Sequence, residues 1–177
     1  MKPLTVVLLA ALALSLPAQD ATIGARVHGV VSMGDLRDLT NGQIGVGLAA
    51  FVSIPLNHGF VLRPLLGAQL IPKGDTLGLA GTKTGIASVD LMVDGLWFPG
   101  EDSEGGAYLV GSVGGQQWRV SASGDTPSTL SYTRLGVSGG LGYQFSPRLG
   151  IEARGFWSPI NSTLTATGLM LGATVKF

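Results

Sequence analysis

The last nine residues, Leu169 to Phe177, alternate between apolar side chains and smaller or polar ones. Successive side chains of a strand point to opposite faces, so the five odd-numbered residues of this segment share one face. The pattern predicts a strand with an apolar face that ends on the ring of Phe177. An apolar strand at the edge of a soluble sheet invites aggregation. In a lipid bilayer, the same strand can instead close a barrel by pairing with the first strand.

The composition favours membrane strands over membrane helices. The 177-residue chain contains 28 Gly and no Cys, and only 12% of its residues are charged. Its mean hydropathy is +0.40. Past the N-terminus no run of 18 apolar residues could cross a bilayer as a helix, so the high apolarity is typical of alternating, lipid-facing strands. The net charge of zero gives no basic surface for nucleic acid, and the absence of Cys excludes disulfides and thiolate metal sites.

Residues 1–18 have the pattern of a secretory signal peptide. Lys2 gives a positive start, Thr5 to Leu16 form a short apolar core, and Pro17-Ala18 provide a cleavage region. The alternative, a retained membrane anchor, is disfavoured because the apolar run is too short. We therefore expect two parts, a signal peptide at 1–18 and a barrel domain at 19–177.

Eight alternating segments are separated by turn residues, which predicts eight strands. Pro64 lies inside the third strand and cannot donate a ladder hydrogen bond, so we expect a bulge there. The phase of the fifth strand is left open, because Leu109 and Gly111 could face outward while Tyr108 and Val110 suggest the opposite. The predicted strands are 22–31, 43–54, 60–71, 85–98, 107–119, 132–145, 149–158 and the C-terminal segment ending at Phe177.

The connections alternate in length, as they do in transmembrane barrels, where short periplasmic turns alternate with longer extracellular loops. The sequence therefore predicts an all-β fold, an eight-stranded antiparallel transmembrane barrel built as an up-and-down meander. The turns expected in the periplasm are 55–59, 99–106 and 146–148. The loops expected outside the cell are 32–42, 72–84, 121–131 and 159–163.

The charged residues fall on the face opposite the apolar one. A lipid-facing Arg or Lys at the middle of the bilayer costs about 2–4 kcal/mol, so charges should point into the lumen. A soluble β-sandwich would alternate in the same way, but its solvent faces would not be so rich in Gly, Ala and Ser. Since eight strands enclose only enough room for side chains, we expect a filled, polar lumen with internal ion pairs, or alternatively a gate whose pairs rearrange. The predicted network is Arg26, Arg63, Asp90, Asp94, Arg134, Glu152 and Arg154.

Aromatic residues of the outward phase gather at the end of the predicted barrel that carries the short turns. Such residues suit the interface between a membrane and water. The sequence predicts a periplasmic aromatic girdle formed by Phe60, Trp97, Tyr143, Phe145 and Phe177.

With a signal peptide, eight alternating strands and a terminal Phe177, the chain resembles the small outer-membrane barrels of the OmpA and OmpX type. The resemblance implies a monomer in the outer membrane of a Gram-negative bacterium, surrounded by lipid. It also implies recognition of the C-terminal strand, ending at Phe177, by the barrel-assembly machinery. Its expected role is structural or surface interaction through the extracellular loops, including an unknown extracellular ligand.

Two other functions were weighed. A narrow channel for small solutes is the first alternative. A lipid-modifying enzyme is less expected, because His28 and His58 lie on the first strand and in a turn, and the last three strands contain no His. We find no residue pattern for catalysis, cofactor binding or metal binding, and we interpret Asp75 and Asp125 as solvated loop residues.

Overall fold

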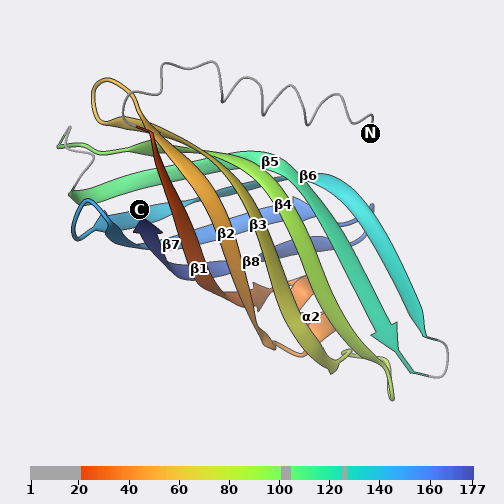
Figure 1. Cartoon of the computed structure of the whole chain (residues 1–177). Coiled ribbons are helices and arrows are strands. Elements are labelled where there is room, and N and C mark those ends of the chain that lie inside the picture. Colours follow the sequence, from red (N-terminus) through yellow and green to blue (C-terminus); the bar gives the residue numbers. More distant parts are fainter. Residues whose placement is uncertain (1–20, 101–104, 125–126) are drawn as a thin grey trace.

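The computed structural model describes residues 21–100, 105–124 and 127–177. Its eight antiparallel strands form one closed barrel, in which each strand pairs with its neighbours in the chain and β1 pairs with β8 (Figure 1). The predicted eight-stranded meander is confirmed. The predicted signal peptide lies outside the described residues. The elements are β1 (Thr22–Met33), α2 (Asp35–Thr40), β2 (Ile44–Pro55), β3 (Phe60–Asp75), β4 (Lys83–Trp97), β5 (Gly106–Ser123), β6 (Ser128–Gln144), β7 (Leu149–Pro159) and β8 (Thr165–Lys176).

The barrel closes through the C-terminal strand, as its alternation predicts. β1 and β8 pair continuously, from Gly24 opposite Lys176 to Met33 opposite Thr167. The N–H of Phe177 donates to the carbonyl oxygen of Ile23 at 2.8 Å, which extends the seam to the last residue. Both edges of the sheet are thereby paired, as a bilayer requires.

The outer wall is apolar. Side chains such as Ile23, Val27 and Leu48 are about two-thirds exposed, whereas the residues between them are buried. On β5 the phase left open by the sequence is settled, since Leu109 is exposed and Tyr108 is buried. In the part of the chain that is described, no helix is long and apolar enough to cross a membrane.

The two ends of the barrel differ. At the short-turn end, residues 56–59 join β2 to β3 and residues 145–148 join β6 to β7. β4 ends and β5 begins at this end, and the C-terminus lies there too (Figure 1). At the opposite, long-loop end, the predicted loop 72–84 is strand at both of its ends, because β3 reaches Asp75 and β4 begins at Lys83. The described part of the predicted loop 121–131 is largely strand, because β5 reaches Ser123 and β6 begins at Ser128. Backbone pairing between neighbouring strands holds these polar residues in extended form, although hydrophobic alternation has ended there.

The predicted loop 32–42 contains the helix α2, which turns inward across the long-loop end. Leu36 of this helix is fully buried, and the Thr40 hydroxyl donates to the Leu36 carbonyl at 2.8 Å. Asn41 and Gly42, both with positive φ, end the helix and lead into β2. The segment is thus partly a lid on the barrel, not an external loop.

The prediction of a bulge at Pro64 is wrong. Pro64 pairs with Val93 of β4 without a shift of register, and the irregularity lies farther along, between Ile71 and Gly74. The effect of proline appears on the side of β3 that pairs with β2, where the β2–β3 pairing stops at Leu65 and resumes at Leu62. A proline without an N–H interrupts one ladder and leaves the register intact.

Inward glycines make room for large inward side chains. A Cβ atom at Gly142 would overlap the ring of Tyr108, and one at Gly24 would overlap the ring of Phe51. Outward glycines are different, because a Cβ at Gly155 would meet nothing within 4 Å. Four outward glycines on adjacent strands form one register row, Gly95, Gly111, Gly139 and Gly155.

We predict that Gly142→Ala destabilises the barrel by about 1–3 kcal/mol, because Tyr108 must leave its position. Urea unfolding in lipid vesicles, followed by tryptophan fluorescence, measures the change. The matched control is Gly155→Ala, which fills open space and should be neutral or stabilise slightly. Equal effects of the two substitutions would contradict the packing argument.

Candidate functional site

The lumen is filled in three layers, and it is not polar throughout, which corrects the expectation of a polar lumen. Two apolar clusters lie at its ends, and charged residues lie between them beside a third, smaller apolar cluster of Ala49, Phe51, Leu65 and Met92. The turn-end cluster is Val61, Leu96, Phe98, Tyr108 and Val110. The loop-end cluster is Val30, Leu36, Ile71, Ile86, Trp118, Phe156, Ile160 and Ala166. We call the charged layer, Arg26, Arg63, Asp94, Glu152 and Arg154, the ion cluster.

The ion cluster alternates cations and anions. Arg63 Nη2 lies 2.8 Å from Asp94 Oδ2 and 2.5 Å from Glu152 Oε1. Arg154 Nη2 lies 2.8 Å from Asp94 Oδ2 and 2.6 Å from Glu152 Oε2. Arg26 is held more loosely, with Nη1 at 3.5 Å from Glu152 Oε2. Because these side chains are shut away from water, each charge depends on its partners.

Neutral side chains donate further hydrogen bonds to the two carboxylates of the ion cluster. The Tyr108 hydroxyl donates to Glu152 Oε1 at 2.8 Å, and the Ser112 hydroxyl donates to Asp94 Oδ1 at 2.5 Å. The guanidinium carbon of Arg63 lies 4.8 Å from the centre of the Phe51 ring. The predicted network contained charged residues only, so it did not include Tyr108 and Ser112.

Two residues of the predicted network lie outside the ion cluster. Asp90 accepts hydrogen bonds from the Ser88 hydroxyl at 2.8 Å and from Gln116 Nε2 at 3.2 Å, and within the described ranges it forms no ion pair.

The assignment of Arg134 to the lumen is wrong. It pairs with Gln116 and so has the inward phase, but it is exposed, and its Nη1 donates to the Thr133 carbonyl at 3.1 Å. β7 pairs with β6 only as far as Val137, so beyond that residue the inner side of β6 faces solvent.

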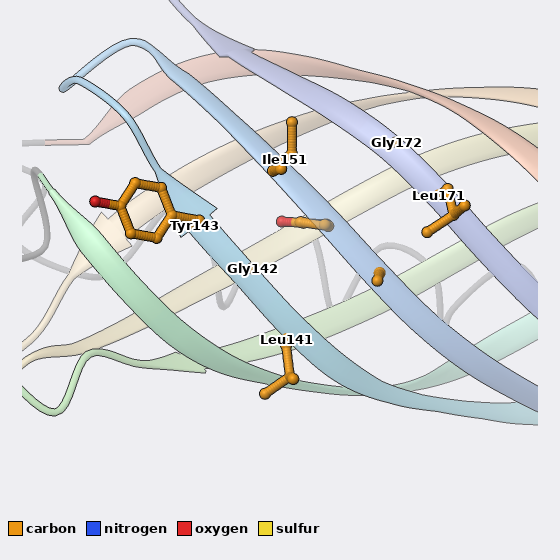
Figure 2. Close-up of a pocket in the computed structure, with 8 residues that line it drawn as sticks. Leu141, Gly142, Tyr143, Ile151, Leu171 and Gly172 are labelled. Carbon is orange, nitrogen blue, oxygen red and sulfur yellow. The ribbon is translucent and has the colours of Figure 1, made fainter.

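The outward aromatic residues gather at the short-turn end. The Phe60 and Trp97 rings are paired across β3 and β4 with centroids 6.4 Å apart, and Tyr143 and Phe145 lie 5.1 Å apart. With Phe177 they are 41–76% exposed, as side chains in contact with lipid would be. A shallow groove of about 420 Å³ in the outer wall is lined by Tyr143 and by apolar residues that include Leu141, Ile151 and Leu171. Figure 2 shows Tyr143 to one side of the other labelled residues.

The two histidines lie in different surroundings. His28 is buried and its Nδ1 has no hydrogen-bond partner, while His58 is exposed in the turn between β2 and β3. Asp75 is exposed and lies 3.9 Å from Lys83, and Asp125 lies outside the described residues. Among the described side chains, no three His, Cys, Asp or Glu residues gather as a metal site would require.

We predict that Glu152→Gln destabilises the barrel by about 3–5 kcal/mol, because it leaves three buried arginines with one carboxylate, that of Asp94, as their counter-charge. The control is Asp75→Asn, which removes an exposed ion pair and should cost no more than about 1 kcal/mol. Urea unfolding of both variants in vesicles checks the difference. A small effect at both positions would show that the buried charges are not mutually dependent.

No family model and no curated protein matches the chain. Solved structures do. The chain is similar to Ail, the attachment invasion locus protein of Yersinia pestis, with 14% identity and a TM-score of 0.61 over 89% of this chain and 97% of Ail. The N-terminal barrel of Pseudomonas aeruginosa OprF gives 14% identity and a TM-score of 0.60 over 88% and 97% of the two chains. Neisserial surface protein A gives 17% identity and a TM-score of 0.58 over 89% and 97%.

At these identities the likeness concerns the fold. The matches extend over nearly the whole of each solved barrel. They agree with the closed eight-stranded meander and with the apolar outer wall of the present structure. The chain therefore has the fold of the small bacterial outer-membrane β-barrels of the OmpA and OmpX type.

Proposed function

We propose that this protein is a monomeric, non-enzymatic barrel of the bacterial outer membrane, with a structural or surface-interaction role at its long-loop end. The observation that carries the proposal is the filled lumen. Leu36, Trp118 and Asp94 are each completely buried, and they belong to two successive layers across the barrel. A closed interior leaves the outer wall and the two ends as the surfaces that meet other molecules.

The filled lumen also weighs against a channel. A permeating ion would have to separate Arg63 and Arg154 from two carboxylates and then displace α2 with its buried Leu36. Separating buried ion pairs is costly because the charges are left without water or partners. The alternative function is a narrow channel, which would conduct only if the ion pairs of the ion cluster rearranged.

In the proposed orientation, the short-turn end lies in the periplasm and the aromatic girdle meets the inner interface of the membrane. Phe177 is 76% exposed at the end of the closing strand, which suits a signal presented to the barrel-assembly machinery. The long-loop end then faces outward, with α2 and the extended β3–β4 and β5–β6 hairpins as its surface.

The chemistry of this surface suits a polar partner. The exposed charged side chains described at this end are mainly basic, namely Arg37, Lys73, Lys83, Arg119 and Arg134 against Asp38 and Asp75. Ail has been solved with the heparin analogue sucrose octasulfate. The excess of basic side chains on this surface favours an anionic partner over a cationic one.

Planar-bilayer recording tests the closed lumen. The purified, refolded barrel should give no regular unit current, because its cross-section is filled by the ion cluster and the loop-end cluster. A large porin refolded in the same detergent serves as the positive control. Regular current steps from this barrel would refute the closed-lumen proposal and favour the channel.

Epitope insertion tests the orientation. A tag placed in the β3–β4 connection, residues 76–82, should be labelled by antibody on intact cells. A tag in the β2–β3 turn, residues 56–59, is the matched control and should be labelled only after the outer membrane is permeabilised. The reverse pattern would overturn the proposed orientation. If neither tagged protein is found in the membrane fraction, the assignment to the outer membrane is refuted.

A further inference from the structure

A small cavity of about 20 Å³ lies inside the barrel, beside the ion cluster. Its lining includes Asp94 and Arg154 of the ion cluster and Phe156 of the loop-end cluster, so it separates these two layers. The other polar residues that line it are Arg26, His28, Gln69, Asp90, Ser112, Gln116 and Ser138. A cavity with this lining is polar, unlike the dry voids of apolar cores.

The pairing register explains why space remains at this level. One row across the sheet runs from His28 through Gly47 to Gln69. The next runs from Arg26 through Ala49 and Gly67 to Asp90. In both rows small residues lie between polar ones. A Cβ at Gly47 would overlap the His28 ring, and a Cβ at Gly67 would lie 3.7 Å from Asp90 Oδ2.

Three atoms of the lining residues are buried without a hydrogen-bond partner: Arg26 Nε, His28 Nδ1 and Gln69 Oε1. Their residues are only 6–8% exposed. Leaving one such group unpaired costs about 1–3 kcal/mol, so three in one cavity point to a ligand. Ser53 Oγ and Thr174 Oγ1 are also unpartnered, but their residues do not line the cavity.

The chemistry of the three atoms identifies the ligand class. Arg26 Nε can only donate a hydrogen bond, Gln69 Oε1 can only accept one, and His28 Nδ1 does either according to its tautomer. A metal cation would face the Arg26 guanidinium, and an anion would face the Asp90 carboxylate. Water both donates and accepts, and one molecule needs only about 10–15 Å³.

We propose that this cavity is a binding site for one water molecule, held by hydrogen bonds to Arg26, His28 and Gln69. The water links β1 to β3 across the small residues of β2. It also gives Arg26, whose ion pair with Glu152 is the longest in the ion cluster, a second point of attachment. The site lies between two filled layers, so the inference does not depend on the outward-facing role proposed above.

A crystal structure of the full barrel at a resolution that defines ordered waters tests the site, together with the variant Gln69→Leu. We expect one water within about 2.7–3.2 Å of both Arg26 Nε and Gln69 Oε1 in the wild type. It should be lost in Gln69→Leu, whose side chain has no acceptor. The matched control is Ser53→Ala, which removes an unpartnered hydroxyl outside the cavity and should keep the water.

A solution measurement covers the case in which Gln69→Leu does not fold. In detergent micelles, the His28 ring of the wild type should show a direct nuclear Overhauser effect from a long-lived water. Where the variant folds, the His28 Nδ1 nitrogen resonance should shift relative to the wild type. An empty cavity, density for an ion, or a water unchanged in Gln69→Leu would overturn the proposal, as would the absence of the water signal in the wild type.

Discussion

Closure of the sheet is the constraint on which the rest of this structure depends. In a bilayer every backbone N–H and C=O must be paired within the protein, and the β1–β8 seam, continued by Phe177, removes the last open edge. Closing eight strands fixes a narrow interior, and side chains must fill it. Large inward residues such as Tyr108 therefore need a glycine on the neighbouring strand. The outer wall consists mainly of apolar residues.

The ion cluster is best understood through its position between two apolar layers. Buried ion pairs add little net stability, since desolvation offsets their attraction, but removing one partner is costly. Arg63 and Arg154 each contact both Asp94 and Glu152, so three strands, β3, β4 and β7, are tied together at one level of the barrel. The apolar layers keep water away from these contacts. The result is a plug in which three arginines share two carboxylates in one specific arrangement.

The local sequence pattern predicted which side chains of a single strand point inward and which point outward. Alternation gave the outward phase of Phe60 and Trp97 and the inward phase of Arg63 and Asp94, because the side-chain period of a strand is two. What depends on neighbouring strands was missed. Arg134 has the inward phase but lies beyond the last β6–β7 pair, and the ends of β3 and β5 are held by pairing, not by hydrophobicity. α2 was hidden because a six-residue helix offers too little periodicity, and only the burial of Leu36 reveals its role.

The strands extend past the loop-end cluster, and this extension determines the shape of the surface at the long-loop end. β3, β4, β5 and β6 carry their hydrogen-bonded register almost to the hairpin tips. The form of this surface is thus set by a rigid ladder, and the sequence at a tip contributes little to it. Foreign segments could be carried at residues 76–82 without changing the ladder below them, which makes the barrel a scaffold for presenting peptides on a cell surface.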